Sequence, residues 1–492
     1  MHFIVKLFPE IIIKSAPVRK RMVKQLHNNL TKLLKSASDE FRVVRQWDKL
    51  EVVGPEVSET HSAEQVAELE RRARAILQQT PGVANFSLVR RYALGDLHDI
   101  YEKTLALWGD ALAGKTFCVR VKRTGEHEFN SGQVEQYVGG GLNQNTEAAG
   151  VKLKDPDVTV RLEIKDGDLY VIENTEAGLG GFPIGTQDSV ISLISGGFDS
   201  NVASYLCIRR GLRTHFLFFN LGGRAHEVGV KEVAHFLWSK YGASHNVKFI
   251  TVPFEGVVSE ILTKVENSQM GVILKRMMLR AASRVAETLN VDALVTGEAV
   301  AQVSSQTLTN LSVIDKVTDT LVLRPLITAD KTDIIKTARE IGTEQFSASM
   351  PEYCGVISVK PTTRAKMDRI EREESRFDFA VLDKAVEERR EESIIDIMEH
   401  VDQEIDVEVL SVPLAESVII DIRHPDEEEQ NPLKVSGATV TKIPFFKLGK
   451  AFKELDGNTR YMLYCSKGVM SRMHAELLFE EGFTNVAVYR PK

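Results

Sequence analysis

Apolar and polar residues alternate along this chain in patterns that predict several successive α/β segments. Residues 1–60 contain three strand-like runs, FIVKLF, RVVRQW and KLEVVG, and one helical pattern that starts near Pro17. Residues 61–170 contain further helices and strands in mixed order, ending in the strands VTVRLEI and LYVIEN. Both segments are therefore predicted to be α+β domains.

From residue 189 to about residue 360, apolar strands and helical patterns alternate regularly. The strands include VISLI, THFLFFNLG, VKFITVPF and DALV, and a helical pattern separates each from the next. This order predicts a doubly wound parallel sheet, in which ligands bind at the carboxyl ends of the strands. The glycine-rich stretch before the first strand indicates a boundary near residue 175, so this domain is expected to span residues 175–361.

The last third of the chain divides into two predicted segments. Residues 362–408 are helical and dense in charge, and we expect a solvated linker without chemistry there. Residues 412–492 start with the strand SVIIDIR and continue through the strand YMLYC to a helical pattern, which predicts a smaller α/β domain.

The sequence SGGFDS at residues 195–200 lies between the strand VISLI and the helical pattern that follows. A glycine-containing turn between a strand and a helix directs backbone N–H groups and the positive helix end at one point, which suits a phosphate. The serines add hydroxyl donors, and Asp199 can hold Mg²⁺. The alternative is a turn that binds no ligand, but the complete motif in this context favours a phosphate site.

A second phosphate-loop pattern, GDALAGKT at residues 109–116, is attributed to chance. The G-x-x-x-x-G-K-[ST] loop needs a strand before it and a helix after it. Here a helical pattern precedes the motif and a strand follows it, so we expect no nucleotide at this position.

Charge is distributed unevenly over the 492 residues, whose formal net charge is −7. Residues 366–430 hold 22 acidic and 8 basic residues, so the remainder is positively charged and an RNA partner is not excluded. No apolar run approaches the roughly 20 residues that span a bilayer. The N-terminus also lacks the features of a signal peptide, so we expect a cytoplasmic protein without a membrane partner.

The four cysteines show no C-x-x-C pair and no zinc-site spacing. Cys118 and Cys207 stand among apolar residues and are assigned to packing. Cys465 follows a strand and precedes a glycine-containing loop and a helix, an arrangement that favours a nucleophilic thiolate, with a buried structural cysteine as the alternative.

The stretch FCVRVKRTGEHEFNS at residues 117–131 alternates apolar with basic residues and resembles the THUMP RNA-binding domain of tRNA-modifying enzymes. The resemblance implies a THUMP domain at residues 61–170, in which Arg120, Lys122 and Arg123 contact the RNA backbone. An exposed polar strand face without RNA would explain the same residues.

SGGFDS after the first strand of such a domain resembles the PP-loop of N-type ATP pyrophosphatases, which adenylate a carbonyl oxygen and release pyrophosphate. Together with GGFPIGTQ, LKRMM, RPLITADKTDI and MPEYCGVIS, it makes nearly the whole chain similar to the tRNA 4-thiouridine synthetases. The resemblance implies a ferredoxin-like fold for residues 1–60, ATP and Mg²⁺ as ligands, and Asp199 as the magnesium residue. The ATP site would comprise Leu193, Ile194, Ser195, Gly196, Gly197, Ser200, Lys275, Gly297 and Gln306. Gly297 would let the backbone approach a base or ribose, and Lys331, in the loop after RPLITAD, would be a second cation for the developing pyrophosphate.

Residues 412–492 resemble a rhodanese domain, with Cys465 as the persulfide carrier and Asp421-Ile422-Arg423 as its early acidic-basic signature. Met470 stands where many rhodaneses have an arginine, which favours a protein persulfide donor over thiosulfate. By the resemblance, Cys354 in MPEYCGVIS would form a redox disulfide with Cys465 after sulfur transfer.

The function that this resemblance implies is ATP-dependent conversion of a tRNA uridine, at position 8 in the family, to 4-thiouridine. The implied partners are tRNA, a cysteine desulfurase as persulfide donor, a ThiS-type sulfur carrier for thiamine thiazole synthesis, and a thiol or thioredoxin-like reductant. A homodimer is also reasonable. The alternatives are another PP-loop enzyme, such as an amide-forming ligase or a sulfate reductase, and a non-enzymatic sulfur relay.

Overall fold

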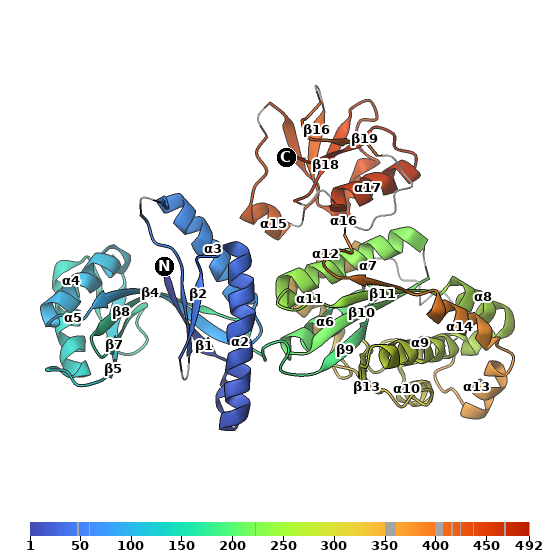
Figure 1. Cartoon of the computed structure of the whole chain (residues 1–492), viewed down its shortest axis with the longest axis horizontal. Coiled ribbons are helices and arrows are strands. Elements are labelled where there is room, and N and C mark those ends of the chain that lie inside the picture. Colours follow the sequence, from blue (N-terminus) through green and yellow to red (C-terminus); the bar gives the residue numbers. More distant parts are fainter. Residues whose placement is uncertain are drawn as a thin grey trace. The chain divides into compact units, whose positions relative to one another are not determined.

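The computed structural model describes residues 1–46, 49–58, 60–221, 223–349, 361–398, 407–414, 417–423, 425–435, 437–466 and 469–491. It divides into two compact units, and Figure 1 shows their helices and strands. The first unit contains residues 1–187 and 209–211, and the second contains residues 188–208 and 212–492. Neither unit has, within these ranges, a helix that is both long and apolar enough to cross a bilayer.

One eight-stranded sheet extends through the first unit, with strand order β2-β3-β1-β4-β8-β7-β5-β6. The long strand β4 joins its two halves, because β4 pairs antiparallel with β1 on one side and with β8 on the other. The elements are β1 (His2–Leu7), α1 (Pro9–Ile12), α2 (Ala16–Ala37), β2 (Arg42–Arg45), β3 (Lys49–Val53), α3 (Ala63–Gln79), β4 (Val83–Ala93), α4 (Leu97–Trp108), β5 (Thr116–Thr124), α5 (Ser131–Asn145), β6 (Gly150–Val151), β7 (Val158–Lys165) and β8 (Asp168–Ala177).

Two main hydrophobic cores lie along this sheet. The first includes α2, whose buried residues Met22, Leu26 and Leu30 recur at one-turn spacing and form an apolar stripe. Helix α3 also packs into this first core, through Ala73 and Leu77, although its sequence lies in the segment that we grouped as residues 61–170. The second core contains α4, α5 and the strands β5, β7 and β8.

The rejection of GDALAGKT as a phosphate loop is confirmed. Helix α4 precedes the motif, a 3₁₀ turn spans Asp110–Leu112 within it, and β5 begins at its last residue, Thr116. The chain therefore enters a strand where a phosphate loop would enter a helix.

A six-stranded sheet organises the second unit, with strand order β13-β12-β9-β10-β11-β14. All its pairs are parallel except the edge pair of β14 with β11, and helices cover both faces, as Figure 1 shows. The prediction of a doubly wound parallel sheet is confirmed. Its elements are β9 (Ser189–Leu193), α6 (Phe198–Arg209), β10 (Arg213–Asn220), α7 (Gly223–Leu237), β11 (Lys248–Pro253), α8 (Glu255–Lys264), α9 (Met270–Thr288), β12 (Ala293–Val295), α10 (Leu308–Asp315), β13 (Leu321–Leu323), α11 (Lys331–Ile341), α12 (Glu344–Ser349), α13 (Met367–Glu374), α14 (Phe379–Glu387) and β14 (Arg390–Ser393).

Much of the charge-dense segment 362–408 folds onto this sheet, whereas we expected a solvated tether. Strand β14 pairs with β11, and Ile370, Phe377 and Leu382 are buried in the same core as α8 and α9. These apolar residues are few and stand among many charges, so the sequence pattern understated their burial.

The C-terminal residues form a separate five-stranded sheet of order β15-β19-β18-β16-β17, with every pair parallel. This arrangement agrees with the predicted α/β domain. Its elements are β15 (Val409–Leu410), β16 (Val418–Asp421), α15 (Pro425–Gln430), β17 (Thr439–Lys442), α16 (Phe445–Phe452), β18 (Tyr461–Tyr464), α17 (Val469–Glu480) and β19 (Val486–Tyr489).

Candidate active site

The turn between β9 and α6 has a glycine backbone with open space on one side. Gly196 has φ +81°, a left-handed conformation that side chains other than glycine rarely adopt. A Cβ on Gly197 would meet only the Ser195 Oγ within 4 Å, so the backbone is open on that side. The buried Ser200 closes the turn, because its Oγ accepts the Ser195 N–H at 3.2 Å. The turn therefore leaves backbone space for a phosphate at the start of α6.

The turn lies at the switch point of the sheet, between β9 and β12, where the strand order reverses. Gly297, just after β12, packs directly on it: a Cβ there would lie 2.5 Å from the Asp199 carbonyl carbon and 2.7 Å from the Ser200 nitrogen. We expected this glycine to admit a base or ribose. The geometry gives a different reason, since only glycine leaves room for the first turn of α6.

Asp199 brings two distant residues to this turn. Its Oδ1 accepts a hydrogen bond from Lys331 Nζ at 2.8 Å, and its Oδ2 accepts one from Gln302 Nε2 at 2.7 Å. Lys331 also lies over the Phe198 ring, 5.6 Å from its centroid. The two predicted site residues Asp199 and Lys331 are thus in contact, and Gln302 is a neighbour that the sequence analysis missed.

The second predicted cation, Lys275 on α9, is held by a buried carboxylate. Its Nζ donates to Glu298 Oε1 at 2.7 Å, and Arg324 Nε donates to the other oxygen at 2.9 Å. Burial alone would raise the pKa of Glu298, but these two cations bring that pKa below its usual value. Lys275 is therefore fixed close to Gly297, the residue before Glu298.

The other predicted ATP residues are buried or half-buried and form hydrogen bonds that shape the site. Leu193 ends β9 half-buried, and the buried Ile194 donates its N–H to the Leu217 carbonyl at 2.9 Å. Gln306 is buried, and its Oε1 accepts the Ala299 N–H at 3.3 Å. Gln306 therefore shapes the loop that carries Gln302.

His226 on α7 is a further neighbour that the sequence analysis missed. Its Nε2 donates to the Ser195 carbonyl at 3.3 Å. Burial lowers the pKa of His226, although this hydrogen bond opposes the shift, so the ring supports the turn in its neutral form at pH 7.

These residues fit ATP, and Asp199 fits one carboxylate of a magnesium site. Gly197 leaves the backbone of the turn open on one side. Lys331 contacts Asp199 in the turn, and Lys275 contacts Glu298, the residue after Gly297. Within the described ranges, no cluster of three or more His, Cys, Asp or Glu could bind a metal alone. Mg²⁺ would therefore rely on ATP oxygens and water besides Asp199, as is common for this ion.

Cys465 lies directly after β18, and its sulfur contacts the first turn of α17. Its Sγ accepts the backbone N–H of Ser471 at 3.3 Å and lies 3.5 Å from the Ser471 Oγ. Only 5% of the residue is exposed. Backbone donors at a helix start stabilise negative charge on sulfur, so this environment suits a thiolate or persulfide.

The acidic-basic signature next to this cysteine forms a buried ion pair. Arg423 donates to both Asp421 oxygens, at 2.9 and 2.6 Å, and its guanidinium packs 5.0 Å from the centroid of the Tyr464 ring. Tyr464 precedes Cys465, so the pair supports the strand end that carries the sulfur.

Two of the three remaining cysteines lie within the described residues. Cys118 and Cys207 are buried, which confirms their assignment to packing. Burial raises the pKa of Cys207 to about 12, so this thiol is unreactive near neutral pH. Cys354 lies outside the described residues, as does its predicted disulfide with Cys465.

The three predicted RNA-binding residues lie on β5 but not on one face. Arg120 and Lys122 are exposed and two residues apart, so they share a face of the strand. Arg123 points to the other face, where it donates to the Gly125 carbonyl at 2.9 Å and contacts His127. Arg120 and Lys122 are thus the more accessible pair.

Comparisons with known proteins identify three regions of the chain. Residues 185–379 match the model of a family described as thiamine biosynthesis protein (ThiI). Residues 95–172 match the THUMP domain, and residues 407–490 match the rhodanese-like domain.

Full-length relatives and solved structures give a consistent picture. The chain is 56% identical over 491 residues to a tRNA sulfurtransferase of Saccharophagus degradans and 56% identical over 492 residues to one of Shewanella loihica, with 100% of each chain covered. Its fold is similar to that of a 4-thiouridine synthetase in complex with RNA and ATP, with a TM-score of 0.68 and 23% identity, over 80% of this chain and 99% of that chain. PH1313 from Pyrococcus horikoshii gives a TM-score of 0.53 at 18% identity, over 70% and 100% of the two chains.

Proposed function

The chain belongs to the tRNA sulfurtransferase family, and we propose that it adenylates a tRNA uridine and replaces the C4 oxygen with persulfide sulfur. Sulfur transfer to tRNA follows from the family. The 4-thiouridine synthetase of similar fold, which was solved with RNA and ATP, supports uridine as the target and ATP as a substrate. The observation that carries the adenylation step is the cluster of Asp199, Gln302 and Lys331 at the open turn of residues 195–200.

In the first step, the uridine O4 bonds to the α-phosphorus of ATP and pyrophosphate leaves. The turn of residues 195–200 binds the phosphates, while Lys275 and Lys331 offset the charge that develops on the leaving group. Asp199 holds Lys331 in place and would provide the carboxylate for Mg²⁺, whose chemistry is to neutralise phosphate charge. The step is needed because the uracil oxygen departs readily only as part of AMP.

In the second step, the terminal sulfur of a persulfide on Cys465 bonds to C4, and AMP leaves with the former O4. The Cys354 thiolate then bonds to the Cys465 sulfur and breaks its bond to the transferred sulfur. The two thiols are oxidised to a disulfide as the transferred sulfur is reduced, and a dithiol reductant restores them. The N–H of Ser471 supports negative charge on Cys465 throughout.

Two variants separate the two steps. With tRNA, α-labelled ATP and no sulfur donor, Cys465→Ala is expected to form pyrophosphate and labelled tRNA as the wild type does. Asp199→Ala is expected to lose both. With a cysteine desulfurase and cysteine added, neither variant should make 4-thiouridine. Adenylation by Asp199→Ala, or thiolation by Cys465→Ala, would refute the corresponding step.

The same persulfide suits a second acceptor, the adenylated carboxyl terminus of a ThiS-type sulfur carrier. The family description of residues 185–379 as a thiamine biosynthesis protein supports this role. Cells whose only copy is Cys465→Ala should then require added thiazole for growth. Growth without thiazole would exclude this use of Cys465.

A further inference from the structure

Two glutamates of helix α13 are buried in the protein interior. Glu374 is buried and accepts two hydrogen bonds from Arg276, at 2.6 and 2.9 Å, and one from Arg280 at 3.1 Å. Glu373 is also buried, and it accepts the backbone N–H of Glu266 at 2.9 Å. The exposed charges of residues 364–376 are the cations Arg364, Lys366, Arg369, Arg372 and Arg376 and the acids Asp368 and Glu371. Burial of the two glutamates therefore leaves this segment with a net positive surface.

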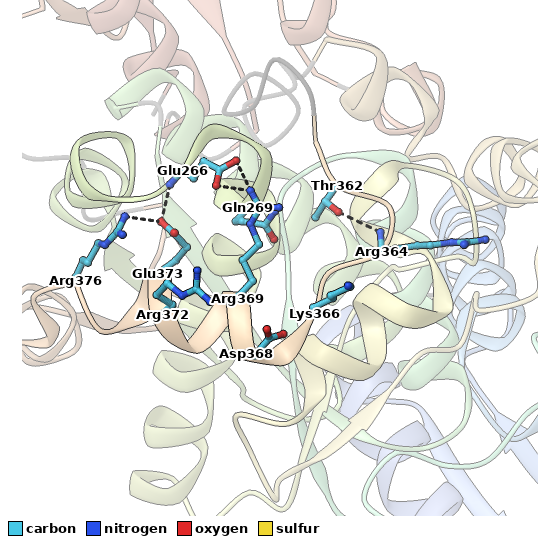
Figure 2. A pocket seen from close by; sticks show the side chains of 10 residues that line it. All are labelled: Glu266, Gln269, Thr362, Arg364, Lys366, Asp368, Arg369, Arg372, Glu373 and Arg376. Carbon is cyan, nitrogen blue, oxygen red and sulfur yellow. Dashed lines mark hydrogen bonds and ion pairs between the residues drawn. The ribbon is translucent and has the colours of Figure 1, made fainter.

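These exposed cations line a cleft of about 530 Å³ between α13 and the start of α9, which we call the basic cleft. Figure 2 shows the side chains around it. The lining residues are Glu266, Gln269, Thr362, Arg364, Lys366, Asp368, Arg369, Arg372, Glu373 and Arg376.

Three of the five cations in the basic cleft are available to a ligand. Arg369 forms an ion pair with Glu266, and Arg376 lies 3.5 Å from Glu373. By contrast, Arg364, Lys366 and Arg372 have no carboxylate within 4.0 Å in the part of the chain that the structure describes. Exposed cations without intramolecular partners are suited to phosphate groups.

A buried acceptor in the same cleft gives a second, independent indication of a ligand. Gln269 is 1% exposed, and its Nε2 donates to the Ser268 Oγ at 2.8 Å. Its Oε1 is buried and has no hydrogen-bond partner among the described residues. An unpaired buried acceptor is unfavourable, so a ligand with a hydroxyl donor would relieve it. RNA carries both phosphates and 2′-hydroxyl groups.

Hydrogen bonds connect the basic cleft to the loop of the candidate active site. Thr307 directly follows Gln306 in the chain, and its Oγ1 donates to the Thr363 carbonyl at 2.8 Å. Asn310 donates to the Thr362 carbonyl and accepts the Ala365 N–H, each at 2.8 Å. The backbone on both sides of Arg364 is therefore fixed to the start of α10.

We propose that the basic cleft binds the phosphodiester backbone of the substrate tRNA through Arg364, Lys366 and Arg372, with Gln269 accepting from a 2′-hydroxyl. This inference rests on the proposed function for the identity of the RNA. It adds an RNA contact within the second unit, separate from the THUMP residues of the first. The cleft would hold the RNA while the uridine occupies the adenylation site.

The test is tRNA binding by the full chain as a function of salt, measured by fluorescence anisotropy without ATP or sulfur donor. The variant Arg364→Gln/Lys366→Gln/Arg372→Gln should bind about 10-fold more weakly near physiological salt. The magnitude of its slope of log K against log salt should fall by about 2 to 3, roughly one for each lost phosphate contact. The control Lys316→Gln/Lys336→Gln/Lys384→Gln removes the same charge from exposed positions outside the cleft and should change the slope less.

Two further variants make the result specific. Arg364→Lys/Arg372→Lys keeps the charge and should keep the slope, whereas a lost slope would contradict a phosphate contact. Gln269→Leu should weaken binding of tRNA more than of a DNA hairpin of the same sequence. An equal loss for both nucleic acids would refute the 2′-hydroxyl contact.

The proposal is overturned if the triple glutamine variant binds tRNA with the affinity and slope of the wild type. It is also overturned if that variant binds tRNA normally but no longer accepts sulfur from a desulfurase, because the cleft would then serve an acidic protein. Since binding is measured without ATP, a failure of the adenylation proposal would appear separately, as wild-type protein that forms no adenylated tRNA.

Discussion

Replacing Gly297 by alanine is expected to slow thiolation about 100-fold while the protein remains folded. The added Cβ would lie 2.5 Å from the Asp199 carbonyl carbon and 2.7 Å from both the Asp199 oxygen and the Ser200 nitrogen. Ordinary contact begins near 3.4 Å, so the first turn of α6 must move by roughly 1 Å, a displacement that can cost about 100-fold in rate. These are backbone atoms, which cannot rotate away as a flexible side chain would.

The assay for Gly297→Ala combines turnover with stability. Single-turnover formation of adenylated tRNA should fall, and the free energy of unfolding should fall by about 1–3 kcal/mol, the usual cost of overpacking. Gly271→Ala is the matched control, since a Cβ there meets nothing within 4 Å and the residue lies in helix α9. Wild-type turnover by Gly297→Ala would refute the idea that this glycine positions the turn.

Two other substitutions test separate parts of the site. Glu298→Gln should destabilise the protein by on the order of 3 kcal/mol, because it leaves Lys275 and Arg324 without their carboxylate. The folded pKa of Glu298 lies below 4.5, so its stabilisation is present above that pH and is lost as the pH falls through the folded value. Urea unfolding should therefore show that the difference in free energy of unfolding between wild type and Glu298→Gln becomes smaller in acid. A difference that does not change with pH would contradict the charge assignment. Cys354→Ala should turn over only with added external thiol, and full activity without thiol would refute the disulfide step.

Local sequence pattern was sufficient to predict the parallel sheet of residues 189–323 and the place of the turn between β9 and α6. The turn of residues 195–200 could be located because a strand, two glycines and a helix are contiguous in the chain. The pairing of Asp199 with Lys331 brings together residues 132 positions apart, and the lysine was proposed from its charge and loop position. Cys465 was similarly identifiable, since its strand, loop and helix are consecutive.

Features that depend on tertiary packing were not predictable in this way. Gln302 carries no motif, and it reaches Asp199 only because β9 and β12 are adjacent in the folded sheet. The role of Gly297 as a packing position depends on the same adjacency.

The basic cleft beside α13 was not predicted from the sequence, for a different reason. Composition counts every acidic residue, whereas burial removes Glu373 and Glu374 from the surface. The net negative charge of residues 366–430 therefore did not indicate the exposed cations of the basic cleft.

The most direct test of adenylation at this site is the 4-thiouridine content of tRNA from cells whose only copy of this protein is Asp199→Ala. Asp199 holds Lys331 at the turn of residues 195–200, and the variant keeps Cys465. Digested tRNA should contain no 4-thiouridine by liquid chromatography and mass spectrometry, while the wild-type copy restores it. Normal 4-thiouridine content in the Asp199→Ala cells would contradict adenylation at this site.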